Sequence, residues 1–323
     1  MSLHHFPPRR RRHYPRAPAT TEPPCPRPKT PCCASCCPTP ACAASPSTWT
    51  RPGRRSPAAA TTLRRPPPLL GEAAAAAALF TGHAKVDGRL SVQLRSPGAI
   101  GTLFAECTAS GGLRGIVRLR EDAGAPPQDL RALGEGALLA ITIENPALGD
   151  AEPMRYQGLV SLQASRLDAA FEGYFQQSEQ LPTRLLLACD GTRAAGLLLQ
   201  KLPGAEGDED GFRRASALFD TLGREELLAL PPAEVVHRLF HEETPQLLGE
   251  KPLAFACSCS RERVEAMLVS LGSEEADAAV AAGDGEARVT CEFCGQDYRF
   301  DAAQMATLFA QAAAAHPSPA ALQ

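Results

Sequence analysis

The sequence lacks several features that define common functional classes. Its longest apolar run, Ala73–Phe80, is too short to span a bilayer, so we expect no membrane partner. The arginine run Arg9–Arg12 is followed by prolines and not by an apolar segment; without a secretory signal, we expect a cytoplasmic protein. We find no phosphate loop, no Gly-x-Ser-x-Gly and no carboxylate pair tied to a cleft. These absences favour a protein that is not an enzyme.

Positive charge is scarce over most of the chain. Residues 1–70 carry 12 Lys and Arg against one acidic residue, whereas the remainder carries 21 Lys and Arg against 35 Asp and Glu. Phosphate contacts need Lys and Arg, so an acidic body disfavours a nucleic-acid partner. The same acidic character suits solubility.

Residues 1–66 contain almost no Leu, Ile or Val and are dominated by Pro, Arg, Ala, Ser and Cys. One interpretation is a low-complexity, disordered basic tail. The other is a frame-shifted translation of GC-rich coding sequence. If each codon begins at the third base of the printed one, Ala41–Ser45 can read Val-Arg-Gly-Glu and Ala60–Arg65 can read Asp-Tyr-Pro-Pro-Pro. Sequencing the gene through this segment distinguishes the two.

From Leu69 onward the pattern becomes that of a globular protein. An alanine-rich helix is expected at Leu69–Phe80, and a second helix opens at Ser165 with Asp168 in a capping pattern. Alternating apolar and polar residues predict strands, which we place at Gly88–Leu94, Leu103–Cys107, Gly115–Leu119, Ala137–Glu144, Arg155–Leu162, Arg184–Ala188 and Gly196–Lys201. Strands that come in pairs with few helices between them predict an α+β fold with a mixed or antiparallel sheet.

The remaining sequence predicts a division into further parts. We expect the core domain to cover residues 67–203, followed at 204–250 by a flexible acidic connector and a helical linker. A small zinc-binding domain follows at 251–313, with a hairpin around its second cysteine pair and a helix capped by Ser260. We expect the last residues, 314–323, to form a disordered tail.

The cysteines are the strongest chemical signal. Six of the 12 lie within residues 25–42, and Cys107 and Cys189 are isolated, as small buried thiols are. The other four form two close pairs with 31 residues between them: Cys257 and Cys259, then Cys291 and Cys294. Four thiolates in two pairs suit tetrahedral zinc, and a module this small needs a metal to fold. We therefore predict a zinc site made by these four residues.

Two roles for this site stay open from the residues alone. A structural zinc knuckle would merely fold the module. However, Cys-x-Cys is an uncommon zinc half-site, and its two sulfurs are close enough to oxidise to each other. Zinc keeps thiols as thiolates, the form that attacks peroxide, and oxidation removes the ligands. This feature favours a redox-sensitive site.

Two other groups of polar residues are less informative. His237 and His241 lie four apart, as zinc ligands can, but the hydrolytic motif needs Glu where Arg238 stands. We interpret them as partly solvated helix histidines. The acidic run Asp208–Asp210 is most simply a solvated connector.

Ordered motifs from residue 69 to about 310 resemble the redox-regulated heat-shock protein 33 chaperone family, also called 33 kDa chaperonins. The motifs are Leu70–Glu72, Asp87-Gly88 followed by Val92–Leu94, Arg114-Gly115, Tyr156–Gly158, Tyr174–Thr183, His241–Glu243, Cys257–Arg263 and Cys291–Gly295. The departure lies in residues 1–66, where the family has a Val-Arg-Gly-Glu and later a Tyr-Pro. The frame-shifted translation contains both of these sequences, in the same order.

The resemblance implies an ATP-independent holdase that is zinc-bound and inactive when reduced. Under oxidative stress the redox disulfides would be Cys257–Cys259 and Cys291–Cys294, zinc would leave, and the zinc module and linker would unfold. The exposed apolar surface would hold unfolding client proteins, and the oxidised form would be a homodimer. The alternatives are a structural zinc-ribbon protein that binds nucleic acid or serves as a scaffold, and a thiol oxidoreductase using Cys291 and Cys294.

Overall fold

The computed structural model describes residues 42–44 and 68–315, apart from positions 85, 121–123, 148–151, 202–209 and 247. Of the segment 1–66, predicted to be disordered or frame-shifted, only residues 42–44 are therefore described. The predicted tail lies outside the described residues from position 316 onward. The Asp208–Glu209 part of the acidic connector lies outside them as well.

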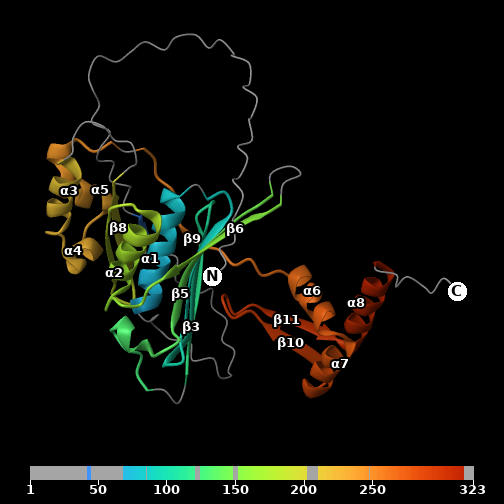
Figure 1. Ribbon diagram of the computed structural model, residues 1–323. Helices are drawn as coiled ribbons and strands as arrows, with labels where there is room; N and C mark the ends of the chain where they lie inside the picture. The colour runs from blue at the N-terminus through green and yellow to red at the C-terminus, as the bar shows by residue number, and fades with distance from the viewer. Residues whose placement is uncertain are drawn as a thin grey trace, which may run out of the picture. The chain divides into compact units, whose positions relative to one another are not determined.

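The core is built on a six-stranded sheet with the strand order β6-β5-β2-β3-β4-β9 (Figure 1). Its neighbours are antiparallel except β4 and β9, which run parallel over two residue pairs. The strands are β2 (Arg89–Arg95), β3 (Ile100–Thr108), β4 (Gly112–Leu119), β5 (Leu138–Asn145), β6 (Met154–Val160) and β9 (Ala254–Phe255). This mixed, mostly antiparallel sheet with its helices confirms the predicted α+β class.

Alternation along the strands explains which face of this sheet is buried. On β2, Leu90, Val92 and Leu94 are all buried. Their register partners on β3 are buried too: Cys107, Ala105 and Leu103. Because side chains alternate between faces with a period of two, these residues share the face that packs into the core. Cys107 is thus a small buried thiol in a strand, as predicted.

Helix α1 (Pro68–His83) lies between the six-stranded sheet and a second sheet with the order β1-β8-β7 (Figure 1). The second sheet consists of β1 (Cys42–Ala44), β7 (Thr183–Cys189) and β8 (Ala194–Gln200), and β7 and β8 form the predicted hairpin. Every residue from Leu70 to Thr81 is buried. A helix buried on all sides needs small residues, which explains the run of alanines. Among the described residues, no helix is both long and apolar enough to cross a bilayer.

Helix α2 (Leu167–Tyr174) continues into a π-helical turn at Phe175–Glu179 and ends at Gln180, where φ is +57°. The prediction that Ser165 caps this helix is wrong, because the N-cap is Arg166 and no side chain caps it. Asp168 is buried and instead accepts hydrogen bonds from Arg166 and from the Leu187 amide of β7. Tertiary pairing has therefore overridden the local capping pattern.

The end of α2 depends on a glycine of β6. A Cβ atom at Gly158 would lie 2.1 Å from the Tyr174 hydroxyl, which hydrogen-bonds Glu179 at 2.7 Å. We expect Gly158→Ala to displace this ring and lower the free energy of unfolding by about 1–3 kcal/mol, as overpacking does. Gly173→Ala is the matched control, since nothing lies within 4 Å of its added Cβ and alanine favours a helix. Urea unfolding of both variants measures the difference, and equal stabilities would contradict the close packing.

Three short helices follow the β7–β8 hairpin and form what we term the three-helix segment (residues 211–240). They are α3 (Gly211–Phe219), α4 (Arg224–Ala229) and α5 (Pro232–Phe240). Phe219, Leu227 and Phe240 of this segment are buried in one cluster with Leu197 and Leu199 of β8. The segment therefore covers the second sheet on the side away from α1.

The C-terminal module (residues 257–315) has a small core of its own. It comprises α6 (Arg261–Leu271), α7 (Ser273–Ala282), β10 (Glu286–Thr290), β11 (Asp297–Asp301) and α8 (Ala302–Ala315). Its buried apolar cluster consists of Val264, Leu268, Ala276, Val280, Ala287, Phe300 and Met305. The predicted hairpin and the predicted cap at Ser260 are both confirmed. A core of seven buried side chains is small for independent stability, which is the usual reason for a metal in such modules.

Candidate metal centre

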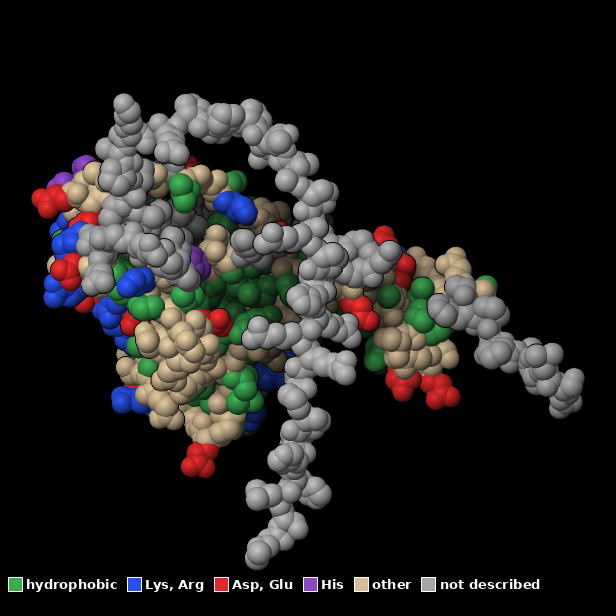
Figure 2. Space-filling view, turned by 45° about the horizontal axis from the view of Figure 1, so that its top comes forward, with side chains coloured by type: hydrophobic (Ala, Val, Ile, Leu, Met, Phe, Trp, Pro, Cys, Tyr) green, Lys and Arg blue, Asp and Glu red, His purple; other side chains and the backbone are tan. Residues whose placement is uncertain are grey.

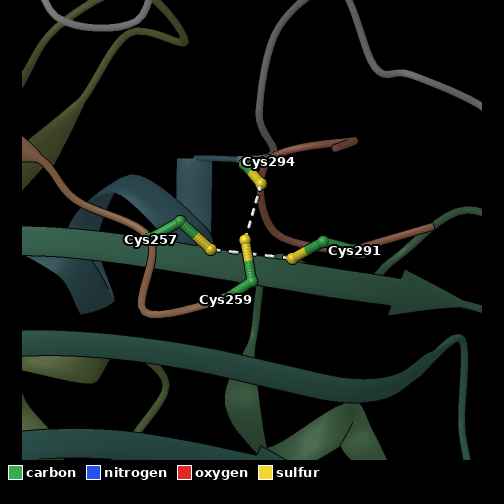
Figure 3. A group of neighbouring side chains, drawn as sticks. All are labelled: Cys257, Cys259, Cys291 and Cys294. Atoms are coloured by element: carbon green, nitrogen blue, oxygen red, sulfur yellow. Dashed lines mark hydrogen bonds between the residues drawn. The ribbon is translucent and has the colours of Figure 1, made fainter. Parts of the chain in front are cut away.

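The four paired cysteines of the C-terminal module converge on one point. Cys257 and Cys259 lie in the loop between β9 and α6, and Cys291 and Cys294 lie in the turn between β10 and β11. Their Sγ atoms lie within 4.8 Å of one another. Figure 3 shows the four side chains pointing toward one another from these two loops. The structure therefore brings together all four residues that the sequence singles out.

The second pair is positioned by a tight turn. The Gly295 amide donates to the Cys291 carbonyl at 2.7 Å, and the Cys291 amide donates to the Gln296 carbonyl at 2.8 Å. Gly295 has a φ of +70°, in the left-handed region that favours glycine. The antiparallel pairing of β10 with β11 holds the ends of this turn together. Cys-x-x-Cys-Gly thus encodes the turn that aims both sulfurs at the centre.

The first pair is positioned by the start of α6. Ser260 is the N-cap of that helix, and its hydroxyl accepts a hydrogen bond from the Arg263 amide at 3.3 Å. The Arg263 guanidinium donates back to the Ser258 carbonyl, between the two cysteines, at 2.9 Å. The loop that carries Cys257 and Cys259 is therefore tied to the helix that follows it.

The spacing of the sulfurs fits a metal ion. The Sγ atoms of Cys257 and Cys291 are 3.6 Å apart, and those of Cys259 and Cys294 are 3.4 Å apart. A tetrahedral ion with metal–sulfur bonds of about 2.3 Å separates its sulfurs by about 3.8 Å. Four thiol donors at this spacing suit a thiophilic divalent ion. The four cysteines could therefore hold one metal ion.

The electrostatics of the site also depend on a cation. Burial raises the pKa of the Cys294 thiol, and hydrogen bonds with the neighbouring cysteines raise it further. Hydrogen bonding with Cys259 likewise raises the pKa of Tyr298 to about 12. Four thiolates this close repel one another unless a cation lies between them. Deprotonation of the four cysteines and metal binding are therefore coupled.

The paired histidines lie elsewhere. His237 is in α5 and His241 directly follows that helix; both are exposed, as predicted for solvated helix histidines. Their ring centroids are 5.5 Å apart, and His241 Nδ1 lies 3.2 Å from the His237 carbonyl oxygen. Within the described part of the chain, the cysteine cluster is the one group of three or more side chains placed to hold an ion.

Arg114 of β4 contacts both cysteine loops, a role that the sequence analysis missed. Its guanidinium donates to the Ser258 hydroxyl at 2.6 Å and lies 4.6 Å from the ring centroid of Phe293. It also donates to the buried Glu106 at 2.8 Å, and the Phe104 ring packs edge-on against Phe293. The residues between the cysteines thus contact the core sheet. The Arg114-Gly115 motif was visible in the sequence, but no local pattern shows which loop an arginine on a strand will contact.

Comparison with known proteins places these features in a family. The family model described as Hsp33 protein matches residues 60–301. Proteins named 33 kDa chaperonin from Ectopseudomonas mendocina and Azotobacter vinelandii are each 45% identical to this chain over 246 residues. These alignments cover 75% of this chain and 82% and 81% of the two relatives.

A solved structure supports the fold. The crystal structure of the 33 kDa chaperonin from Thermotoga maritima superposes with a TM-score of 0.59 at 20% identity, covering 76% of this chain and 86% of that one. At this identity the likeness concerns the fold, which is the α+β arrangement described above. The family match, the identity to the curated relatives and the converging cysteines agree, and the chain belongs to the Hsp33 family.

Proposed function

We propose that the protein is a redox-regulated, ATP-independent holdase chaperone. In this proposal the four cysteines hold zinc in the reduced, inactive state. Oxidation converts them to two disulfides, the ion is released, and the C-terminal module and the three-helix segment unfold. The apolar surface exposed in this way binds unfolding client proteins in the cytoplasm, and the oxidised form is a homodimer. The protein catalyses no reaction of its own.

The observation that carries this proposal is the convergence of four thiols in a module with only seven buried side chains in its core. Zinc, when bound, supplies four bonds that cross-link the two cysteine loops and hold the thiols as thiolates. A module of this size relies on such cross-links for its stability. If the four cysteines can no longer bind the ion, the C-terminal module therefore unfolds.

The chemistry of the switch needs only peroxide. One cysteine thiolate attacks the peroxide O–O bond to give a sulfenic acid and hydroxide, and a second thiol then displaces hydroxide from that sulfur. For each disulfide, two thiols and one hydrogen peroxide give one S–S bond and two waters. Sulfur is oxidised and the peroxide oxygens are reduced, so no further reactant is required.

We propose Cys257–Cys259 and Cys291–Cys294 as the pairs, although the reduced geometry places cross-pairs within reach. Cys257 and Cys291 are 3.6 Å apart, and Cys259 and Cys294 are 3.4 Å apart. Once the module loosens, loop-closure entropy favours cysteines separated by one or two residues over those on different loops. Peptide mapping of the oxidised protein distinguishes the two pairings.

The face drawn in Figure 2 does not have the charge distribution expected of a nucleic-acid site. On the face drawn in Figure 2, basic and acidic side chains are interspersed. A nucleic-acid site needs basic residues gathered on one surface. The alternative of a zinc-ribbon protein that binds nucleic acid predicts salt-dependent binding of RNA or DNA, and the alternative of a thiol oxidoreductase predicts catalytic turnover of a disulfide substrate.

The proposal is tested with reduced, zinc-loaded full-length protein and a heat-denatured client whose aggregation is followed by light scattering. We expect no suppression before oxidation. Peroxide with mild heat should release about one zinc per chain, measured with a chromogenic chelator, and switch suppression on. Because residues 25–42 carry six further cysteines, a variant with those six changed to Ser should behave identically. Equal suppression by the reduced, zinc-loaded protein, or peroxide treatment that releases zinc without switching suppression on, would overturn the proposal.

A further inference from the structure

A group of three charges, of which the two carboxylates are buried, joins the three-helix segment to the core. The Arg224 guanidinium, at the start of α4, donates to Glu72 Oε1 at 2.8 Å and to Asp168 Oδ2 at 2.9 Å. Glu72 belongs to α1 and is 7% exposed; Asp168 belongs to α2 and is 1% exposed. One side chain of the three-helix segment therefore bridges two carboxylates on different helices of the core.

The two carboxylates depend on Arg224 to different degrees. Asp168 also accepts hydrogen bonds from Arg166, from the Ala169 amide at 2.8 Å and from the Leu187 amide at 3.4 Å. For Glu72, Arg224 is the hydrogen-bond partner found among the described residues. Burial raises the pKa of Glu72, which Arg224 counteracts. If α4 left the core, Asp168 would keep its other hydrogen-bond partners, whereas Glu72 would lose the one found for it among the described residues.

The position of Arg224 favours docking of α4 on the core but does not favour formation of the helix itself. It is the first residue of α4, and the preceding Gly223 offers no side-chain cap. A cation at a helix N-terminus is repelled by the positive end of the helix dipole. A helix of six residues is also too short to be stable alone, so its order depends on what it packs against. Arg224 is therefore unfavourable for the local stability of α4, and its position is explained by its tertiary contact with the core.

Two other contacts between the three-helix segment and the core differ from this bridge: one is apolar, and the other is made by a solvent-exposed carboxylate. Leu227 of α4 is buried against the second sheet, but apolar burial is not directional. A further ion pair to the core, Arg184 with Asp220, has a more exposed carboxylate: 53% of the Asp220 side chain is accessible, against 9% for Glu72 and 2% for Asp168. Exposed pairs contribute little to stability. The Arg224 bridge, whose two carboxylates are buried, is therefore the directional contact on which the docking position of the segment depends most.

We propose that Arg224 is a latch that holds the three-helix segment on the core in the reduced state, and that Glu72 is its main partner. This inference deepens the proposed function and rests on it, because the segment is the part that the redox switch releases. Release of the segment then requires Arg224 to withdraw from Glu72 and Asp168. The latch, and not only the metal, sets how readily the segment opens.

The test is hydrogen exchange of the reduced, zinc-loaded full-length protein. In R224Q we expect amides of α4 to exchange at least about tenfold faster than in the unchanged protein, with the zinc content and the protection of β2–β5 unaltered. R213Q is the matched control: Arg213 lies in α3, its side chain is 79% exposed, and its ion pair is with Asp210, the residue directly before the segment. We expect R213Q to leave α4 protection unchanged.

Two further variants separate a latch from a general loss of folding. R224K keeps the charge and should restore most of the protection of α4. In an E72Q background, R224Q should have a much smaller effect than alone, because its main partner is already neutral. Unchanged α4 protection in R224Q overturns the latch, and so does R224K with the same exchange as R224Q. If R224Q also unfolds the core, its exchange rates no longer test the latch. The test then rests on R224K and on the comparison of E72Q with the E72Q/R224Q double variant.

The outcomes also separate the latch from the proposed function. With the latch open and zinc still bound, R224Q should show part of the client suppression of the oxidised protein without peroxide. If peroxide fails to activate the unchanged protein while R224Q still exposes α4, the proposed function fails and the latch stands. If peroxide activates the unchanged protein while α4 exchange in R224Q is unaltered, the latch fails and the proposed function stands.

Discussion

We expect replacement of Cys291 with Ser to abolish stoichiometric binding of the proposed zinc ion and to unfold the C-terminal module while the core stays folded. A hydroxyl in place of one thiolate removes one of four ligands from a site whose sulfurs all lie within 4.8 Å of one another. Zinc binding in modules of this kind contributes on the order of 10 kcal/mol to folding. The module buries only seven apolar side chains in its core and has no comparable replacement for that contribution.

The effect is measured by zinc content and by hydrogen exchange resolved along the chain. Amides of β10, β11 and α6 should lose protection, whereas those of β2 and β3 should keep it. Cys189→Ser is the matched control, because Cys189 is a free thiol at the end of β7, outside the cluster. Retention of a protected, zinc-free module in the Cys291 variant would show that the module folds on its own, contrary to our account.

Replacing Phe171 with Ala should cost the protein about 3–5 kcal/mol of unfolding free energy, the range found for buried Phe-to-Ala changes. Phe171 of α2 is 0% exposed and packs edge-to-face on Phe80 of α1, with ring centroids 5.0 Å apart. Phe80 in turn packs on Phe175, with centroids 5.2 Å apart. Truncation leaves a cavity where α1 and α2 meet, and a domain with 5–15 kcal/mol of stability tolerates that loss poorly.

Urea unfolding followed by circular dichroism measures this cost. Leu159→Ala is a suitable control, since Leu159 is 65% exposed on the edge strand β6. We expect the control to stay within about 0.5 kcal/mol of the unchanged protein. A loss below about 1 kcal/mol in the Phe171 variant would mean that the junction between α1 and α2 collapses around the gap or carries little of the stability.

Features governed by local pattern could be predicted from the sequence. The alanine run, the alternating strands and the β7–β8 hairpin lie within a few residues of their predicted ends. The Ser260 cap, which accepts from Arg263, follows from side chains adjacent in sequence. The four cysteines could be found because their spacing within each pair is itself the geometry of a half-site.

Features set by contacts between distant residues could not be predicted. The bridge from Arg224 to Glu72 spans 152 residues, and no periodicity in either helix indicates it. The two-residue strand β9 is too short to leave a pattern, and it pairs parallel to β4. The expected cap at Ser165 failed for the same reason: Asp168 bonds to Arg166 and to β7, and the buried pairing outweighs the local motif. Topology decides these contacts, and topology does not follow from local propensity.

The central claim is that oxidation of the four cysteines expels the metal and activates the chaperone. It is tested most directly by native mass spectrometry with peptide mapping, before and after a peroxide dose that switches on client suppression. The reduced chain should carry one zinc. The activated chain should carry none, with disulfides linking Cys257 to Cys259 and Cys291 to Cys294. An activated chain that still holds zinc on four reduced cysteines would contradict the account.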